Sequence, residues 1–182
     1  MKIHTFLFLV FILGSCAVNS VSSQGVEKNE TEVAVEVPQH NVQIMIREHI
    51  PYCGGAYPSD EQLNRSKPYD AGLVLTNTID GSKKDVNAKN GVLYLNLPEG
   101  KYTLKEKYKD IPFNQFFLNA ERSGGSYIIP GDSICYKKWW ESNLVEFEVI
   151  SNEATKILNC TVSSRCYTGI NPCDYYNGPY PP

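Results

Sequence analysis

The stretch from residue 91 to residue 104 constrains the fold more than any other part of the chain. Large apolar side chains recur at every second position along it, at Leu93, Leu95 and Leu97 and again at Tyr102 and Leu104, with a Pro-Glu-Gly step at residues 98–100 that predicts a turn. Strict alternation is typical of a strand with one buried face, because successive side chains of a strand point to opposite sides of its sheet. The stretch therefore predicts a β-hairpin whose inward side chains are Leu93, Leu95, Leu97, Tyr102 and Leu104.

The same period of two recurs after residue 40, with turn signals between the alternating runs. Asp80-Gly81 and Asn90-Gly91 are the clearest of these signals, because glycine accepts the positive φ that a tight turn requires. Residues 59–62 are expected to form only a short helical turn. Further strands are expected at residues 42–50, 71–78, 113–118, 127–129, 144–150 and 155–160, the last two as a closing hairpin.

Composition supports this β interpretation. Hydrophobic residues make up 42% of the chain, which is enough for a real core, and the chain contains twelve Tyr and seven Phe, residues that pack well on a pleated surface. No strand–helix–strand alternation and no long internal repeat is visible in the sequence. The predicted fold class is all-β, an antiparallel β-sandwich followed by an irregular, cysteine-containing C-terminal tail.

One run of residues also resembles a known family. The pattern Gly91-x-Leu93-x-Leu95-x-Leu97-Pro98-x-Gly100-x-Tyr102-x-Leu104 resembles the signature hairpin of carboxypeptidase-regulatory-like and collagen-adhesin B-type domains. The resemblance covers about residues 70–108 and implies a transthyretin-like (prealbumin-like) β-sandwich. It implies little about function, because this scaffold serves adhesion, transport and enzyme accessory roles. Adhesin members often carry an internal Lys-Asn isopeptide bond, whose residues cannot be placed in this sequence.

The N-terminus reads as an export signal. Lys2 precedes an apolar run at residues 6–13 that is shorter than the roughly 20 residues needed to span a membrane. Leu13-Gly14-Ser15-Cys16 resembles a bacterial lipobox, which implies acylation of Cys16 and cleavage before it. The alternative is ordinary cleavage near residues 22–24, which would release a soluble product.

These signals divide the chain into four parts. We expect a lipoprotein signal peptide at 1–15, a flexible polar tether at 16–39, the β-sandwich domain at 40–160, and a Cys/Tyr/Pro-rich tail packed on the domain at 161–182. The expected location is the cell envelope, with a lipid anchor in the outer membrane or at the cell surface. The alternative location is secreted or periplasmic.

The cysteines predict covalent links. Five remain once Cys16 is set aside, so we expect two disulfides, with one cysteine free or paired elsewhere. The three cysteines nearest the C-terminus are expected to contribute to both bridges, and Cys53 to be one partner. An alternative is a metal site in which His49 and Cys53 act with C-terminal cysteines, although no Cys-x-x-Cys is present. The disulfide candidates are Cys53, Cys135, Cys160, Cys166 and Cys173.

One segment is a candidate ligand surface. Lys137, Lys138, Trp139 and Trp140 combine cations with two indoles, a composition suited to sugar stacking or to a protein partner. The other interpretation is that one of the indoles fills the end of the sandwich.

The function classes that the sequence disfavours are also informative. The Gly-x-Ser-x-Gly, His-Glu-x-x-His, phosphate-loop and EF-hand patterns are absent, so no catalytic residue is predicted. The net charge is −3 and the Lys and Arg residues are scattered, which disfavours nucleic acid as a partner. We expect an envelope lipoprotein that is a non-catalytic binding or structural module, with a membrane contact through its lipid, a glycan or protein partner, and no cofactor. The alternatives are a metal-handling protein that uses cysteines and His49, and a small cysteine-dependent enzyme.

Overall fold

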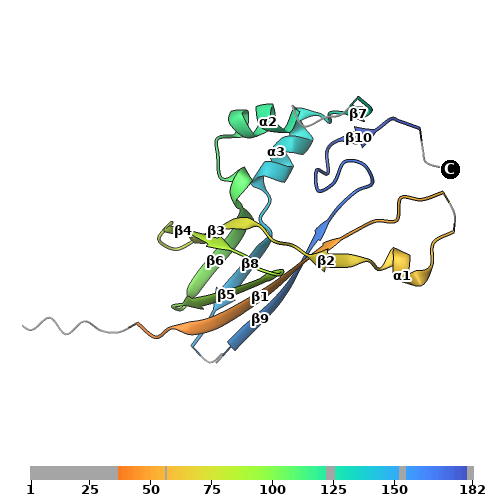
Figure 1. The fold of residues 1–182 in the computed structure, drawn as a ribbon. Helices are drawn as coiled ribbons and strands as arrows, with labels where there is room; N and C mark the ends of the chain where they lie inside the picture. The colour runs from red at the N-terminus through yellow and green to blue at the C-terminus, as the bar shows by residue number, and fades with distance from the viewer. Residues whose placement is uncertain (1–36, 56, 122–125, 152–154, 180–182) are drawn as a thin grey trace, which may run out of the picture. The chain divides into compact units, whose positions relative to one another are not determined.

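The structure is a computed structural model, and it describes residues 37–55, 57–121, 126–151 and 155–179 (Figure 1). All described elements belong to one compact unit, and most of the secondary structure is β, as predicted. In chain order the elements are β1 (His40–His49), α1 (Asp60–Leu63), β2 (Ser66–Pro68), β3 (Gly72–Asn77), β4 (Lys83–Asn87), β5 (Val92–Leu97), β6 (Gly100–Glu106), the 3₁₀ helix η1 (Lys107–Lys109), α2 (Phe113–Glu121), β7 (Ile128–Ile129), α3 (Ser133–Glu141), β8 (Val145–Val149), β9 (Thr155–Ser163) and β10 (Tyr175–Tyr176).

The strands form two four-stranded sheets and one small ribbon. In the first sheet β1 is central, with β9 on one side and with β5 and then β2 along the other. The second sheet has the order β4-β3-β6-β8, and β7 pairs with β10 in the ribbon. The pairs are antiparallel except for β1 and β9, which run parallel over nine residues of register. A purely antiparallel arrangement was expected, so the parallel pair is a correction.

Both four-stranded sheets bury their apolar faces in a single cluster, the aliphatic core. All five side chains that alternation placed inside are buried in this core, so that prediction is confirmed. The core residues of the two sheets are Val42, Ile44, Ile46, Leu93, Leu95, Leu97, Cys160 and Val162 from the first, and Leu73, Leu75, Val86, Tyr102, Leu104, Phe147 and Val149 from the second.

The strand partners differ from those expected. The Pro-Glu-Gly turn closes no hairpin, because β5 pairs with β1 whereas β6 pairs with β3 and β8. The turn carries the chain from the first sheet to the second, so both strands face one core from opposite layers. The predicted closing hairpin is wrong in the same way, since β8 belongs to the second sheet and β9 to the first. Alternation reports which face of a strand is buried, and it does not report the neighbouring strand.

The turn before β5 shows why its sequence is Asn-Gly. Asn90 and Gly91 both have positive φ, at 51° and 69°. A Cβ on Gly91 would lie 2.5 Å from the carbonyl oxygen of Ile46, so the site excludes any side chain. The amide of Gly91 donates to Asp70 Oδ1 at 2.7 Å, and the amide of Ile46 donates to the Gly91 carbonyl at 2.7 Å. The turn is therefore joined directly to the central strand.

Residues 113–118 form helix α2, where a strand was expected. Apolar residues recur there at i, i+3, i+4 and i+7, which is helical spacing: Phe113, Phe116, Phe117 and Ala120. The second nine-residue helix, α3, begins after Asp132, whose side chain accepts from the Cys135 amide at 2.7 Å. The expected short helical turn is α1, in which Ser59 and Gln62 form a capping box.

The two helices lie together at one end of the sheets, beside η1 (Figure 1). Their facing side chains form a second cluster, the aromatic cluster, with Phe116, Tyr136 and Cys173 buried at its centre. Partly buried residues packed against these are Ile111, Phe113, Phe117, Ala120, Cys135, Trp139 and Trp140. In the described part of the chain, no helix is both long enough and apolar enough to cross a membrane.

Candidate functional site

Two disulfides are present, as predicted. One joins Cys53 to Cys166 and the other joins Cys135 to Cys173, so each bridge takes one cysteine from the C-terminal group. Cys160 is the free cysteine of the described residues, and burial raises the pKa of its thiol, which disfavours the reactive thiolate. Cys16 lies outside the described residues, with the predicted signal peptide and most of the tether.

The alternative metal site lacks its main ligand. Cys53 is bonded to Cys166, so its sulfur is not available as the thiolate that a metal or a nucleophilic mechanism would need. His49 is half-buried at the end of β1. Over residues 37–179, wherever the structure describes them, no group of three or more His, Cys, Asp and Glu side chains is placed to hold a metal ion.

The structure divides the predicted ligand surface in two. Helix α3 presents Lys137 and Lys138 to solvent, whereas Trp139 and Trp140 are half-buried against the aromatic cluster. The indole of Trp140 donates to the carbonyl of Ile111 at 2.8 Å, which ties the helix to the segment before α2. The two lysines are therefore the exposed part of the predicted surface, and the two indoles pack against the protein.

Other cations lie over the two indoles. Lys105 Nζ is 4.7 Å from the ring centroid of Trp140, and Lys109 Nζ is 5.5 Å from that of Trp139. Both distances are within the range of a cation–π interaction. The pairing of cations with indoles therefore exists here, but through lysines of β6 and η1.

The indole of Trp139 also lines a cleft of about 220 Å³, which we call the Trp139 cleft. It opens where η1, the end of α3 and the end of β9 meet. Tyr108 forms a second aromatic wall, with its ring centroid 6.0 Å from that of Trp139. The polar groups along the cleft belong to Glu106, Lys109, Ser142, Asn143, Thr161 and Ser163.

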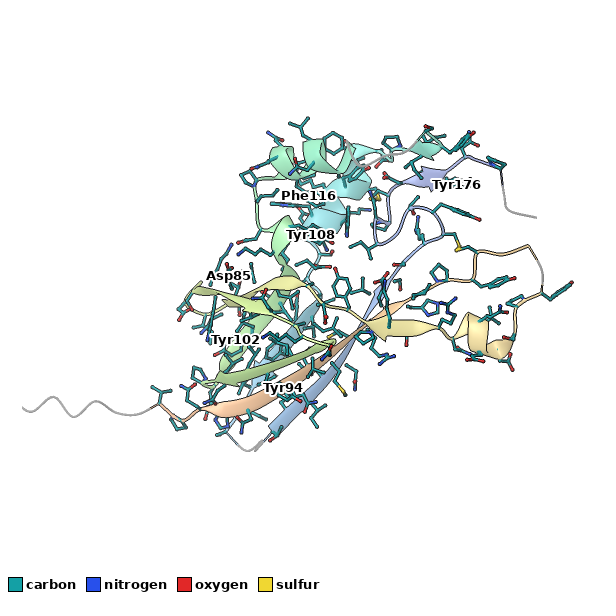
Figure 2. All side chains as sticks on the ribbon, in the orientation of Figure 1. Asp85, Tyr94, Tyr102, Tyr108, Phe116 and Tyr176 are labelled. Carbon is teal, nitrogen blue, oxygen red and sulfur yellow. A yellow bond between two sulfur atoms is a disulfide. The ribbon has the colours of Figure 1, made fainter. Side chains whose placement is uncertain are left out.

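A smaller apolar pocket of about 170 Å³ lies against the same two rings. It is lined by Tyr108, Trp139, Phe116, Asn119 and Ala120. Figure 2 shows Tyr108 next to Phe116, and their ring centroids are 6.4 Å apart. Tyr108 and Trp139 thus line both a polar cleft and an apolar pocket, and a substitution of either ring would change the shape of both.

A buried ion pair forms the floor of the Trp139 cleft. Lys109 Nζ lies 3.1 Å from Glu106 Oε2, and the two side chains are 3% and 6% exposed. Lys109 Nζ also donates to Ser142 Oγ at 3.1 Å. Although the Lys109 ammonium is close, Glu106 Oε2 accepts no hydrogen bond from any described group. A buried carboxylate oxygen with spare accepting capacity is unusual, since buried polar atoms are generally satisfied.

The charge of Glu106 affects the neighbouring phenols. Burial is the main cause of the raised pKa of Tyr108, and the negative charge of Glu106 raises it further. The same two causes, with Glu48 in addition, raise the pKa of Tyr69 to about 12. Both phenols therefore keep their hydrogen-bond donors to a higher pH than an ordinary tyrosine does.

Of the residues that line the Trp139 cleft, only Trp139 is predicted from the sequence as a site residue. The signal for Glu106 was present, because it continues the inward series of Tyr102 and Leu104 by one more alternate position. A charged residue at an inward position of a strand needs a buried partner. Lys109 supplies it, and η1 is the turn that brings this lysine back over the strand end.

Comparisons with models of protein families, with curated proteins and with solved structures find no match for this chain. The function therefore has to be inferred from the chemistry of the described residues.

Proposed function

We propose that this chain is a cell-envelope lipoprotein whose folded part is a non-catalytic binding module, and that its ligand binds in the Trp139 cleft. The observation that carries the proposal is the combination of two aromatic walls with a buried carboxylate–ammonium pair in a single concave site. Sites for small ligands are typically concave and combine aromatic side chains with precisely placed polar groups.

The chemistry of the lining favours a neutral, hydroxyl-rich ligand such as one sugar residue. Aromatic faces pack against the C–H groups of a sugar ring, and the Glu106, Lys109 and Ser142 groups can accept from or donate to its hydroxyls. The ion pair is internally neutral, so it selects neither anions nor cations. At about 220 Å³ the cleft is smaller than a typical drug-sized pocket, which suits a single residue or the end of a chain.

The same groups support binding without turnover. Hydrolysis of a glycosidic bond generally uses two carboxyl groups on either side of that bond. Glu106 is the one carboxylate among the described residues that line the cleft, and Lys109 holds it in an ion pair. This arrangement fixes charge in place and offers no acid–base couple.

Three features support the rest of the proposal. Stable disulfides form mainly in oxidising compartments, and two are present. The lipobox resemblance at residues 13–16 accounts for membrane attachment. Because both sheets share one aliphatic core, a transthyretin-like β-sandwich remains the fold that we propose.

Intrinsic fluorescence tests the binding site, because both tryptophans of the chain lie at the aromatic cluster and Trp139 lines the cleft. Glucose, galactose, mannose and N-acetylglucosamine are titrated separately into the exported chain carrying Cys16→Ser. We expect a saturable change in emission with at least one of them. Tyr108→Ala should weaken the affinity about fivefold, because an aromatic contact contributes about 1 kcal/mol.

The control is Tyr127→Ala, since Tyr127 is exposed and distant from the cleft lining. It should leave the titration unchanged. If none of the four sugars alters the emission or the NMR chemical shifts of the cleft, the sugar assignment is wrong.

Lipid attachment needs a separate experiment. Cells expressing the chain are fed a radioactive fatty acid, and the protein is then followed through membrane fractionation. The label and the membrane association should both be lost in Cys16→Ser, whereas Cys160→Ser should keep both. A Cys16→Ser chain that remains labelled would exclude the lipobox.

A further inference from the structure

The outward face of the first sheet is unusual because it carries no charge over three successive rows. In each row a residue of β1 lies between one of β5 and one of β9. We call these nine positions the neutral face. Its rows are Asn96–Asn41–Thr155, Tyr94–Gln43–Ile157 and Val92–Met45–Asn159.

The outward face of the second sheet carries many charged side chains. Its side chains include Lys83, Asp85, Lys101, Lys105, Glu146 and Glu148. Lys101 lies directly across from Glu148, and Lys107 forms an ion pair with Asp85. Charged residues make up 20% of the chain, yet the first sheet carries none on its outward face over these three rows, and the first charge on β1 is Arg47 in the row that follows.

The neutral face also exposes large apolar side chains at its centre. Tyr94, labelled in Figure 2, is 74% exposed and Ile157 is 57% exposed, and by strand register they flank Gln43 in the middle row. Met45 and Val92 lie in the next row. An apolar centre bordered by amides and hydroxyls, with charge excluded, is the composition of the core of a protein–protein interface.

We propose that the neutral face binds the neutral face of a second copy of this chain. Asn, Gln, Thr and Tyr side chains each carry both a donor and an acceptor, so such a surface can satisfy its own copy across a two-fold axis. Two copies of an uncharged surface can also meet without the like-charge contacts that destabilise a complex. The absence of charge from these three rows thus makes the neutral face suited to self-association.

The geometry favours stacking of the faces over extension of the sheet. Lys156 is the only charged residue of β9, and it lies on the core side of this edge strand, opposite Val42. An inward-pointing charge on an edge strand disfavours pairing with another strand. Nine positions are also fewer than the roughly 20–30 residues per side of a stable interface. The association is therefore weak in solution and, on the lipid anchoring proposed above, becomes significant when the chains are confined to one membrane.

Sedimentation equilibrium of the exported Cys16→Ser chain, at concentrations up to about 1 mM, tests this inference. We expect a reversible monomer–dimer equilibrium. Tyr94→Lys and Ile157→Lys each introduce a cation at the centre of the face, and both should weaken the dimer at least tenfold because like charges then meet. Both side chains are largely exposed, so the fold should be unaffected, which far-UV circular dichroism checks.

The matched control is Ile79→Lys, because Ile79 is also 74% exposed but lies in the turn before β4. It should leave the dimer intact. A chain that stays monomeric throughout, or a dimer that survives both neutral-face substitutions, overturns the inference. In that case binding of a soluble neutral glucan to the wild-type chain, but not to Tyr94→Lys, would assign the face to a glycan. The sugar titration of the Trp139 cleft is independent of this result, since the neutral face and the cleft lining share no residue.

Discussion

The aliphatic core and the aromatic cluster are both buried, yet they are held together differently. The core contains side chains from seven strands of two sheets and includes no covalent link, since its cysteine, Cys160, is free. The aromatic cluster is built on two nine-residue helices and one segment of the tail. There the Cys135–Cys173 disulfide crosses the cluster, and Tyr136 donates a buried hydrogen bond to Asp174.

This difference shows that a small buried cluster needs a covalent link to stay folded, whereas a large one does not. Helices of nine residues are marginal in water, because nucleation of a helix is unfavourable and few hydrogen bonds follow it. A small set of rings buries too little area to hold such helices against a tail with few aliphatic residues. A disulfide between α3 and the tail removes much of the remaining conformational freedom.

Leu104→Ala should give the largest effect and should act on both regions. Leu104 is fully buried in the core, so its truncation is expected to lower the free energy of unfolding by about 2–5 kcal/mol. Urea unfolding is followed by far-UV circular dichroism, which reports the strands, and by tryptophan fluorescence, which reports the aromatic cluster. Both transitions should move together, because the cluster rests on the sheets. If fluorescence alone stayed at its wild-type midpoint, the two regions would fold independently.

Replacing Cys135 and Cys173 by Ser together should separate the two probes. Loss of a disulfide that closes a loop with a sequence separation of 38 is expected to remove about 2–4 kcal/mol. The fluorescence transition should then precede the circular dichroism transition. The matched control is the Cys53→Ser, Cys166→Ser pair, which removes the other bridge and leaves α3 linked to the tail. In this control the fluorescence transition should coincide with the circular dichroism transition. Coincident transitions in both double variants would show that the aromatic cluster does not depend on the Cys135–Cys173 disulfide.

The smallest effect concerns the non-covalent link between core and tail. Glu48 of β1 accepts a hydrogen bond from Ser164, the first residue after β9, and lies 3.2 Å from Lys67. The Ser164 bond is the largest cause of the lowered pKa of Glu48, and Lys67 adds to it. A lowered pKa stabilises the fold above the ordinary value of 4.5, and this contribution is lost as pH falls through the folded-state pKa.

Glu48→Gln should therefore flatten the decline of the urea midpoint between about pH 5 and pH 3. Glu148→Gln serves as the control, because Glu148 is exposed on the second sheet and should leave the decline as it is. An unchanged pH profile in Glu48→Gln would show that the hydrogen bond between Glu48 and Ser164 does not contribute to stability.

The sequence predicted burial well and pairing poorly. Alternation located the inward side chains around Leu93 and Leu104, because the pleat of a strand has the same period wherever its partner lies. It could not tell that β5 and β6 belong to different sheets, nor that β9 joins β1 in parallel. Those choices depend on contacts between distant segments, which a local pattern does not contain.

Helix α2 and the Trp139 cleft were not predicted from the sequence, for more specific reasons. Aromatic content favours strands, and it outweighed the helical spacing of Phe113, Phe116 and Phe117 in the prediction. Likewise, four neighbouring letters do not show that the two lysines face solvent whereas the two indoles pack against the aromatic cluster. In the sequence, the only sign of the ion pair between Glu106 and Lys109 is that an acidic residue occupies the next inward position after Tyr102 and Leu104.

The parallel pairing of β1 with β9 has a consequence for how the chain matures. These are the first and the last long strands of the described unit, so the central strand of the first sheet lacks one neighbour until nearly the whole polypeptide has emerged. The first sheet therefore cannot be completed from the amino end alone. If the chain is exported as proposed, this late step of folding is compatible with passage through a translocation channel before the sheet closes.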